Sequence, residues 1–226
     1  MATKSDVATT IMNTALGLAE SQGWRKVTMA DIAAKSGQKP DRVFAEFPTK
    51  EAILRAFARR IDAEVLREPL DSDGTVRDRL FDLIMRRFDA LAPHRAGIRA
   101  ILNDIVGDPF AALAGLCAVH RSMSLTLEAA GVSASGPAGR LRANVLAGLY
   151  LRAFYGWLQN DDTEGSDDRI MAQLDKALTR VERIATSFAG QRERLEARRQ
   201  ARRAARHRPS DVEASAAGAA EAPEQA

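Results

Sequence analysis

Apolar residues recur at helical spacing along almost the whole chain, up to about residue 189. Near the N-terminus, five of them share one face, namely Val7, Ile11, Ala15, Leu18 and Ala19. Gly23 follows this face, and a glycine there ends a helix because it adopts the left-handed conformation without strain. Aromatic residues make up only 5% of the chain, while Ala, Leu, Arg and Glu are plentiful, which favours helices over strands. The sequence therefore predicts an all-α fold.

Changes in composition divide the chain into three parts. Segment 69–74 is polar and rich in turn-forming residues, so we place a boundary there, between a domain of residues 1–66 and a second domain of residues 67–189. In the second domain we expect helices near 75–91, 95–106, 109–130, 138–160 and 167–188. Residues 190–226 hold few bulky apolar side chains, which predicts a disordered tail. Its segment 192–208 carries eight Arg against two Glu, which suits a solvated extension or a nonspecific contact with an anionic surface.

Several functional classes find no support in the residues present. The only cysteine, Cys117, excludes a disulfide framework, and with His120 alone nearby we expect no metal site. No nucleophile motif or phosphate loop stands out, so we expect neither an enzyme nor a cofactor. The net charge of +3 permits nucleic-acid binding without requiring it. We read no stretch as apolar enough to span a membrane and find no unbroken signal core, so we expect a cytoplasmic protein.

Three residues within segment 27–54 have the spacing of a helix-turn-helix. Such a motif needs a small residue where its two helices cross, and Ala33 occupies that position. Four residues later it needs a glycine for the tight turn, which Gly37 supplies, and six residues after that Val43 provides an apolar contact between the helices. Two short core helices around a chance glycine are the alternative. The complete set, with Gly23 and a Thr28 helix cap upstream, favours the helix-turn-helix.

The same segment resembles the TetR family of bacterial regulators over about residues 7–57. The matching elements are Gly23, Thr28, Asp31-Ile32-Ala33, Ser36-Gly37, Phe44, Phe47 and Lys50-Glu51. The resemblance implies an N-terminal helix-turn-helix domain, followed by a C-terminal helical domain for ligand binding and dimerisation. It also implies a homodimeric transcriptional regulator that binds a palindromic DNA operator. We expect a repressor that a small apolar ligand releases from DNA.

The resemblance further implies DNA contacts for six residues, which are Thr28, Gln38, Lys39, Arg42, Phe44 and Lys50. Arg42 could offer a bidentate pair of hydrogen bonds to guanine, and Thr28 could hold a phosphate at a helix N-terminus. Lys50 would contact the DNA backbone as a point charge. Phe44 stands where the family commonly has a tyrosine, and it lacks the phosphate-binding hydroxyl. For the charged residues the alternative is a solvated surface, and for Phe44 it is a core position.

Two acidic residues depart from the family pattern on the helix expected to face DNA. Asp41 and Glu46 bring two carboxylates toward the DNA. A carboxylate can accept a hydrogen bond from cytosine, but more often it is repelled by the phosphates. Residues 1–66 carry ten Lys and Arg against eight Asp and Glu, a small excess for a DNA-binding domain. The residues that maintain the motif's scaffold are therefore better preserved than its DNA-facing surface.

The helices expected in the second domain are apolar on more than one side. A small domain seldom needs so many apolar residues without a cavity or a partner surface, although a plain core is the alternative. We expect eight residues to line a ligand cavity, namely Phe81, Met85, Phe88, Leu102, Phe110, Leu113, Cys117 and Phe154.

Segment 141–162 carries apolar residues near heptad spacing, which are Ala143, Ala147, Leu151, Phe154 and Leu158. With the helix expected near 167–188, this face predicts half of a four-helix bundle between two subunits. The alternative is a helical pair within one chain.

A second function remains open because the C-terminal half is also similar to lipid-binding proteins of ubiquinone biosynthesis. Those proteins have the TetR fold but have lost DNA binding, and they present lipid precursors to a partner enzyme. Asp41 and Glu46 favour this alternative. Ala33, Gly37 and Lys50 favour the regulator.

Overall fold

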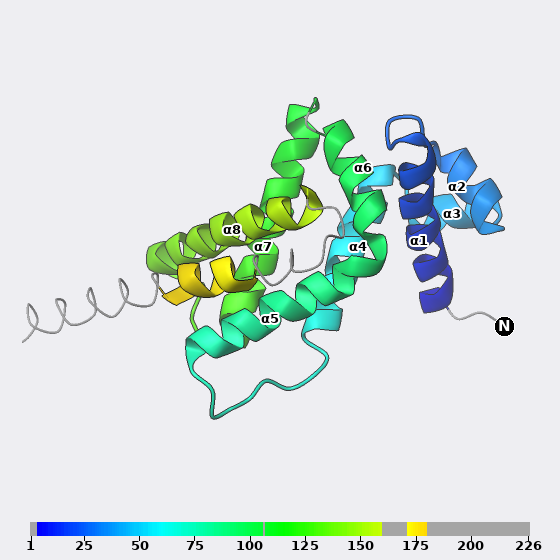
Figure 1. Cartoon of the computed structure of the whole chain (residues 1–226). Helices are drawn as coiled ribbons and strands as arrows, with labels where there is room; N and C mark the ends of the chain where they lie inside the picture. The colour runs from blue at the N-terminus through cyan, green and yellow to red at the C-terminus, as the bar shows by residue number, and fades with distance from the viewer. Residues whose placement is uncertain (1–3, 106, 160–170, 180–226) are drawn as a thin grey trace, which may run out of the picture. The chain divides into compact units, whose positions relative to one another are not determined.

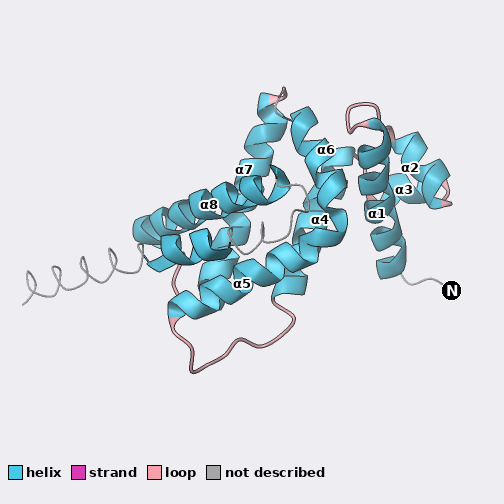
Figure 2. Ribbon diagram, viewed as in Figure 1, coloured by secondary structure: helices cyan, strands magenta, loops and turns pink. Residues whose placement is uncertain are grey.

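The computed structural model describes residues 4–105, 107–159 and 171–179, and every regular element within these ranges is helical (Figures 1 and 2). The elements are α1 (Lys4–Gln22), α2 (Met29–Ser36), α3 (Pro40–Glu46), α4 (Lys50–Val65), α5 (Val76–Leu91), η1 (Ala92–His94), α6 (Arg95–Ile105), α7 (Pro109–Ala129) and α8 (Gly136–Gln159). Residues 171–179 are also helical. The prediction of an all-α fold is confirmed.

The predicted helices agree with the structure to within two residues for α5 to α8. The helix expected near 167–188 is described only over 171–179, and the tail predicted at 190–226 lies outside the described residues, as does its Arg-rich segment 192–208. The boundary placed in segment 69–74 falls in the loop between α4 and α5. Residues on both sides of this loop belong to one compact unit, which extends to Leu178.

The core of α1 follows the predicted apolar face. Val7, Ile11, Ala15 and Ala19 are buried, and Gly23 ends the helix with a φ of 82°. Several helices begin at threonine caps, which satisfy backbone N–H groups that have no partner within the helix. At α5, for example, the Thr75 hydroxyl accepts a hydrogen bond from the Asp78 backbone N–H.

Helix α4 is joined to the C-terminal helices by a buried ion pair. The Arg87 guanidinium of α5 lies 2.5 Å from the Asp62 carboxylate of α4, and both side chains are more than nine-tenths buried. Arg87 also lies over the ring of Tyr150 from α8, at 5.9 Å from its centroid. Burial raises the pKa of the Tyr150 phenol far above its usual value, so this phenol stays protonated and neutral.

Helix α7 differs from the expectation that no segment is apolar enough to span a membrane. By length and composition alone it passes that test, with a mean hydropathy of 1.3 over its best window, of which 22% is buried. The reason is its first half, where Phe110, Leu113 and Leu116 are exposed and no Lys, Arg, Asp or Glu occurs between Pro109 and His120.

Candidate DNA-binding surface and ligand pocket

The helix-turn-helix predicted from three residues is present in α2 and α3. Ala33 and Val43 are buried where the two helices meet. Gly37 ends α2 in the left-handed conformation, with a φ of 67°. A side chain at that φ would be strained, so the turn depends on glycine. The predicted role of each of the three residues is confirmed.

Thr28 and Asp31 form a capping box that fixes the start of α2. The Thr28 hydroxyl accepts from the Asp31 backbone N–H at 3.1 Å and donates to the Asp31 carboxylate at 2.7 Å. The same carboxylate accepts from the Thr28 backbone N–H at 2.9 Å. These bonds from Thr28 lower the pKa of the exposed Asp31 carboxyl. Thr28 is itself exposed, although its hydroxyl already serves the cap.

The residues around the start of α3 form a small exposed surface. Lys39 and Arg42 are exposed, Gln38 is half-buried, and Phe44 is 50% exposed rather than a core residue. Asp41 is also exposed in the first turn of α3. The start of α3 thus exposes two cations and one carboxylate, and the Phe44 side chain is partly exposed on the same short helix. We refer to Gln38, Lys39, Arg42 and Phe44 as the α3 surface.

Lys50 is placed differently from the other expected DNA contacts. Its ammonium donates to the Trp24 carbonyl oxygen at 2.8 Å and lies 4.8 Å from the centroid of the Trp24 indole ring. Lys50 thereby ties the start of α4 to the turn that follows α1. The hydrogen bond and the cation–π contact orient the ammonium toward Trp24.

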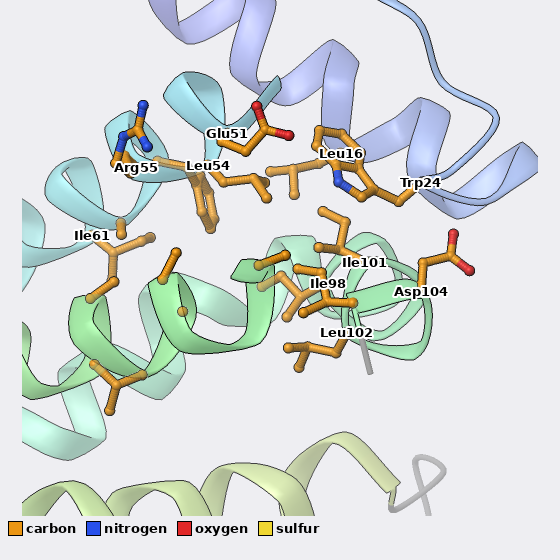
Figure 3. A pocket seen from close by; sticks show the side chains of 18 of the residues that line it. Leu16, Trp24, Glu51, Leu54, Arg55, Ile61, Ile98, Ile101, Leu102 and Asp104 are labelled. Atoms are coloured by element: carbon orange, nitrogen blue, oxygen red, sulfur yellow. The ribbon is translucent and has the colours of Figure 1, made fainter. Parts of the chain in front are cut away.

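A pocket of about 440 Å³ opens beside Lys50 and Trp24 (Figure 3). Its walls come from α1, α4, α5, α6, α7 and α8, and they are mostly apolar. Figure 3 shows Leu54 of α4 on one side of this space and Ile98, Ile101 and Leu102 of α6 on the other. The volume lies within the range of small-molecule sites.

Only Leu102 and Phe154 of the eight residues expected to line a ligand cavity do line this pocket. Phe88 is buried in the core, where its ring stacks on Tyr150, and Phe81 and Met85 are half-buried against that core. The remaining three residues, Phe110, Leu113 and Cys117, are exposed on α7.

The pocket-facing side of α7 carries small residues, which a pattern of bulky side chains does not reveal. These residues are Ala111, Ala114, Gly115 and Ala118. Their spacing is helical, and it could have indicated a face with room beside it. In this chain, bulky apolar residues fill the core or lie on the surface. A cavity instead forms where the side chains are too small to fill the space between helices.

Two contacts fasten α6 to α1 and to the turn that follows it. The Asp104 carboxylate of α6 accepts a hydrogen bond from the Arg25 backbone N–H at 2.9 Å. Near the start of α6, Gly97 lies against the backbone of Leu16 in α1. The pocket wall formed by α6 therefore bears directly on α1 and on the turn before the helix-turn-helix.

Helix α8 does not present the predicted heptad face to the outside. Ala143, Ala147 and Leu158 are buried within the subunit, so assigning them to a partner helix is wrong. The face that α8 leaves exposed contains Leu141 (65% exposed), Val145 (39%) and Tyr155 (65%). The heptad rule found the apolar stripe, but α7 of the same chain covers part of it. Within the described ranges no cluster of three His, Cys, Asp or Glu residues forms a metal site.

Comparison with known families gives a match at the N-terminus. The model of the bacterial regulatory proteins of the tetR family matches residues 11–57, which cover most of α1 and the helix-turn-helix. Among curated proteins, none matches this chain.

Solved structures share the fold over most of the chain. A TetR transcriptional regulator from Nitrosomonas europaea has a TM-score of 0.63 at 26% identity, covering 76% of this chain and 95% of its own. A tetR-family regulator from Streptomyces coelicolor has a TM-score of 0.57 at 18% identity, covering 89% and 90%. Thermus thermophilus FadR, a TetR-family repressor solved with lauroyl-CoA, has a TM-score of 0.51 at 21% identity, covering 76% and 91%.

Proposed function

We propose that the chain is a TetR-family repressor that a small apolar ligand releases from DNA, which the tetR-family match over residues 11–57 and the shared fold support. The observation that carries this proposal is the position of the pocket. Its walls include Leu16 of α1, Trp24 of the turn that follows and Lys50 of α4, together with Ile98 of α6 and Val119 of α7. A ligand in this space therefore touches the helices that hold the helix-turn-helix.

Release would follow from how α4 is connected. Only Phe47, Pro48 and Thr49 separate the end of α3 from the start of α4, and Phe47 is buried. A ligand that widens the space between α4 and α6 moves α4, and α3 must move with it. Because two recognition helices have to fit two half-sites at a fixed spacing, a small shift lowers the affinity for the operator.

DNA binding would use the α3 surface, with Arg42 reading a base and Lys39 near the phosphates. Two such surfaces are needed for a palindromic operator, so the proposal includes a homodimer. We place the dimer contact on the exposed face of α8 that contains Leu141, Val145 and Tyr155. Apolar side chains exposed in a row on one helix are suited to burial against a second subunit.

The apolar nature of the ligand is supported by the pocket walls and by one relative. FadR, which shares the fold, is a repressor whose structure contains lauroyl-CoA. The walls of the present pocket offer mainly Leu, Ile, Val, Phe and Ala side chains. Burial of an apolar ligand in such a space is favourable by about 25 cal/mol per Å² of apolar surface removed from water.

The test combines DNA selection with a pocket-filling variant. Genomic fragments are selected with the purified full-length protein, and we expect an enriched palindrome. Gly115 lines the pocket, and a Cβ atom added there would meet no atom within 4 Å, so Gly115→Leu is designed to extend a side chain into the pocket. This variant should bind the operator normally and resist release by cell-derived apolar extract. The matched control is Gly17→Leu on α1, where space is also open but which does not line this pocket.

The opposite results would reject the proposal. If no sequence is enriched even at low salt, the regulator is wrong, and co-purified isoprenoid or acyl lipid would favour the lipid-binding alternative. If Gly115→Leu responds to the extract as Gly17→Leu does, the pocket is not the regulatory site.

A further inference from the structure

The pocket is elongated, because two helices line it along their length. On α4 its residues extend from Lys50 to Ile61, and on α7 from Ala111 to Ser122. Each stretch covers three helical turns, which is roughly 16 Å at the helical rise of 1.5 Å per residue. A compact molecule would occupy only part of this length.

The two helices run in the same direction along the pocket. At one end, Lys50 at the start of α4 contacts Trp24, and the next residue, Arg25, is bound by Asp104 near the end of α6. The α6–α7 turn follows directly, so the starts of α4 and α7 lie at the same end. At the opposite end are Arg87 and Tyr150. We call these the Lys50 end and the Arg87 end.

The two ends differ in exposure. At the Lys50 end, Arg25, Glu51, Arg55 and Asp108 are exposed, so this end opens to solvent. At the Arg87 end, the lining residues Arg87, Ser122 and Tyr150 are all buried. The Arg87 charge is already neutralised by Asp62. A carboxylate at the closed end could reach only the Arg87 Nε, which has no hydrogen-bond partner among the described residues, and it would be fully desolvated beside the Asp62 carboxylate, which is unfavourable.

The carboxylates at the open end already accept hydrogen bonds from the protein. Asp104 accepts from Arg25, and Asp108 accepts from two backbone N–H groups at the start of α7, at 3.0 and 3.1 Å. Hydrogen bonds at the start of α4 lower the pKa of the Glu51 carboxyl and hold it ionised.

The cations at this end retain donors for a ligand. Lys50 makes one hydrogen bond, to Trp24, although an ammonium has three donors. The Arg25 guanidinium lies beside Gly107 at the rim of the pocket. A hydrogen-bond acceptor that carries negative charge therefore suits the Lys50 end.

We infer that the pocket binds a linear amphipathic ligand of the fatty-acid type, with its chain between α4 and α7 and its anionic head at Lys50 and Arg25. The chain lies against the small side chains of α7, and its terminal methyl group points toward the Arg87 end. The inference rests on the proposed function only in linking this ligand to release from DNA. In that link, the head group binds the Lys50 ammonium, which is also expected to contact the DNA backbone.

The chain and the head are tested separately by calorimetry on the full-length protein without DNA. The probes are octanoate, decanoate and dodecanoate, each below its micellar concentration, together with dodecanol and naphthalene. Affinity should rise by about fourfold for each added methylene group while the chain still fits. Dodecanoate should bind about tenfold more tightly than dodecanol, because only the anion pairs with the cations. Naphthalene should bind more weakly than dodecanoate.

Three variants test the position of the head group. Lys50→Met keeps the apolar stem, and Arg25→Met keeps the backbone N–H that Asp104 binds. Each should weaken dodecanoate binding by about tenfold and leave dodecanol binding unchanged. Arg59→Met is the matched control, since Arg59 is exposed on α4 outside the pocket. If Lys50→Met does not fold, Arg25→Met alone decides the result.

Each contrary outcome overturns a defined part of the inference. Affinity that is independent of chain length, or naphthalene binding as tightly as dodecanoate, excludes a linear ligand. Equal effects of Arg25→Met and Arg59→Met exclude the head-group position. If dodecanoate binds as expected but leaves the affinity for the operator unchanged, the ligand class holds and the proposed release mechanism fails.

Discussion

A Cβ atom on Gly97 would lie 2.6 Å from the carbonyl oxygen of Leu16, so α6 and α1 touch through their backbones. No side chain separates the two helices at this point. A displacement of α6 by a ligand is therefore transmitted to α1 without a flexible element between them.

Gly97→Ala should destabilise the protein, because the added methyl group meets backbone atoms that cannot rotate away. We expect a loss of about 1–3 kcal/mol in the free energy of unfolding, the range for overpacked cores. Urea denaturation measures it as a lower midpoint at an unchanged slope. Gly17→Ala is the matched control on α1, where nothing lies within 4 Å, and it should be neutral or stabilising by up to about 1 kcal/mol. Equal midpoints for the two variants would contradict the close contact.

His94 should make stability depend on pH. Its ring nitrogen lies 3.1 Å from the Arg60 guanidinium, and its ring meets Phe57 edge-on at 5.2 Å. Burial, and secondly the Arg60 charge, lower the pKa of His94 below its ordinary value of about 6.5. The unfolded chain therefore binds a proton at a higher pH than the folded one. The stabilisation is complete above about pH 6.5 and is lost as the pH falls toward the folded pKa.

The measurement is chemical denaturation between about pH 7.5 and pH 5.5. His94→Gln should reduce the fall in stability over this interval, whereas His120→Gln on α7 should leave it in place. If both variants retain the full pH dependence, another group is responsible.

The helix-turn-helix could be predicted because its determinants are local. Gly37 must adopt a positive φ, and Ala33 and Val43 are fixed by the crossing of two adjacent helices, so spacing alone reveals them. The Lys50–Trp24 contact could not be predicted in the same way. It joins residues 26 positions apart, and it depends on where the start of α4 meets the turn after α1.

The pocket was harder to predict because it depends on the packing of six helices. Large apolar residues such as Phe110 and Phe88 indicated a cavity, yet one is exposed and the other fills the core. Leu102 and Phe154 were found because they also face the space left by the small residues of α7. On α8, periodicity located an apolar stripe but could not show which side of it is covered by the same chain.

Substitution on the outer face of α8 should abolish dimerisation. Tyr155 is 65% exposed, and Tyr155→Lys would place a charge in the proposed interface without disturbing the subunit core. We expect light scattering at micromolar concentration to give a dimer for the native protein and a monomer for the variant. Leu113→Lys on α7, also exposed, is the matched control. A dimer that survives Tyr155→Lys but dissociates in Leu113→Lys would place the interface on α7.

Arg42 and Lys50 should affect DNA binding in different ways, because they would contact different parts of DNA. Arg42→Ala should cost about 1–3 kcal/mol at one or two base positions and relax the sequence preference there. Lys50→Ala should weaken binding to all sequences and lower the slope of log affinity against log salt by about one unit. The measurement is fluorescence anisotropy with the selected operator and with a scrambled duplex, at several salt concentrations.

Because Lys50 also holds Trp24, the melting temperature of Lys50→Ala has to be measured beside its DNA affinity. Arg59→Ala on the same helix controls for the loss of one positive charge. A weaker complex with a changed melting temperature and an unchanged salt slope would mean that Lys50 acts by positioning α4.

The acidic residues Asp41 and Glu46 test whether the α3 surface reads DNA at all. If Asp41→Asn with Glu46→Gln raises affinity for every duplex while no sequence is preferred, the α3 surface does not read DNA, and the lipid-binding alternative gains the support that the regulator loses.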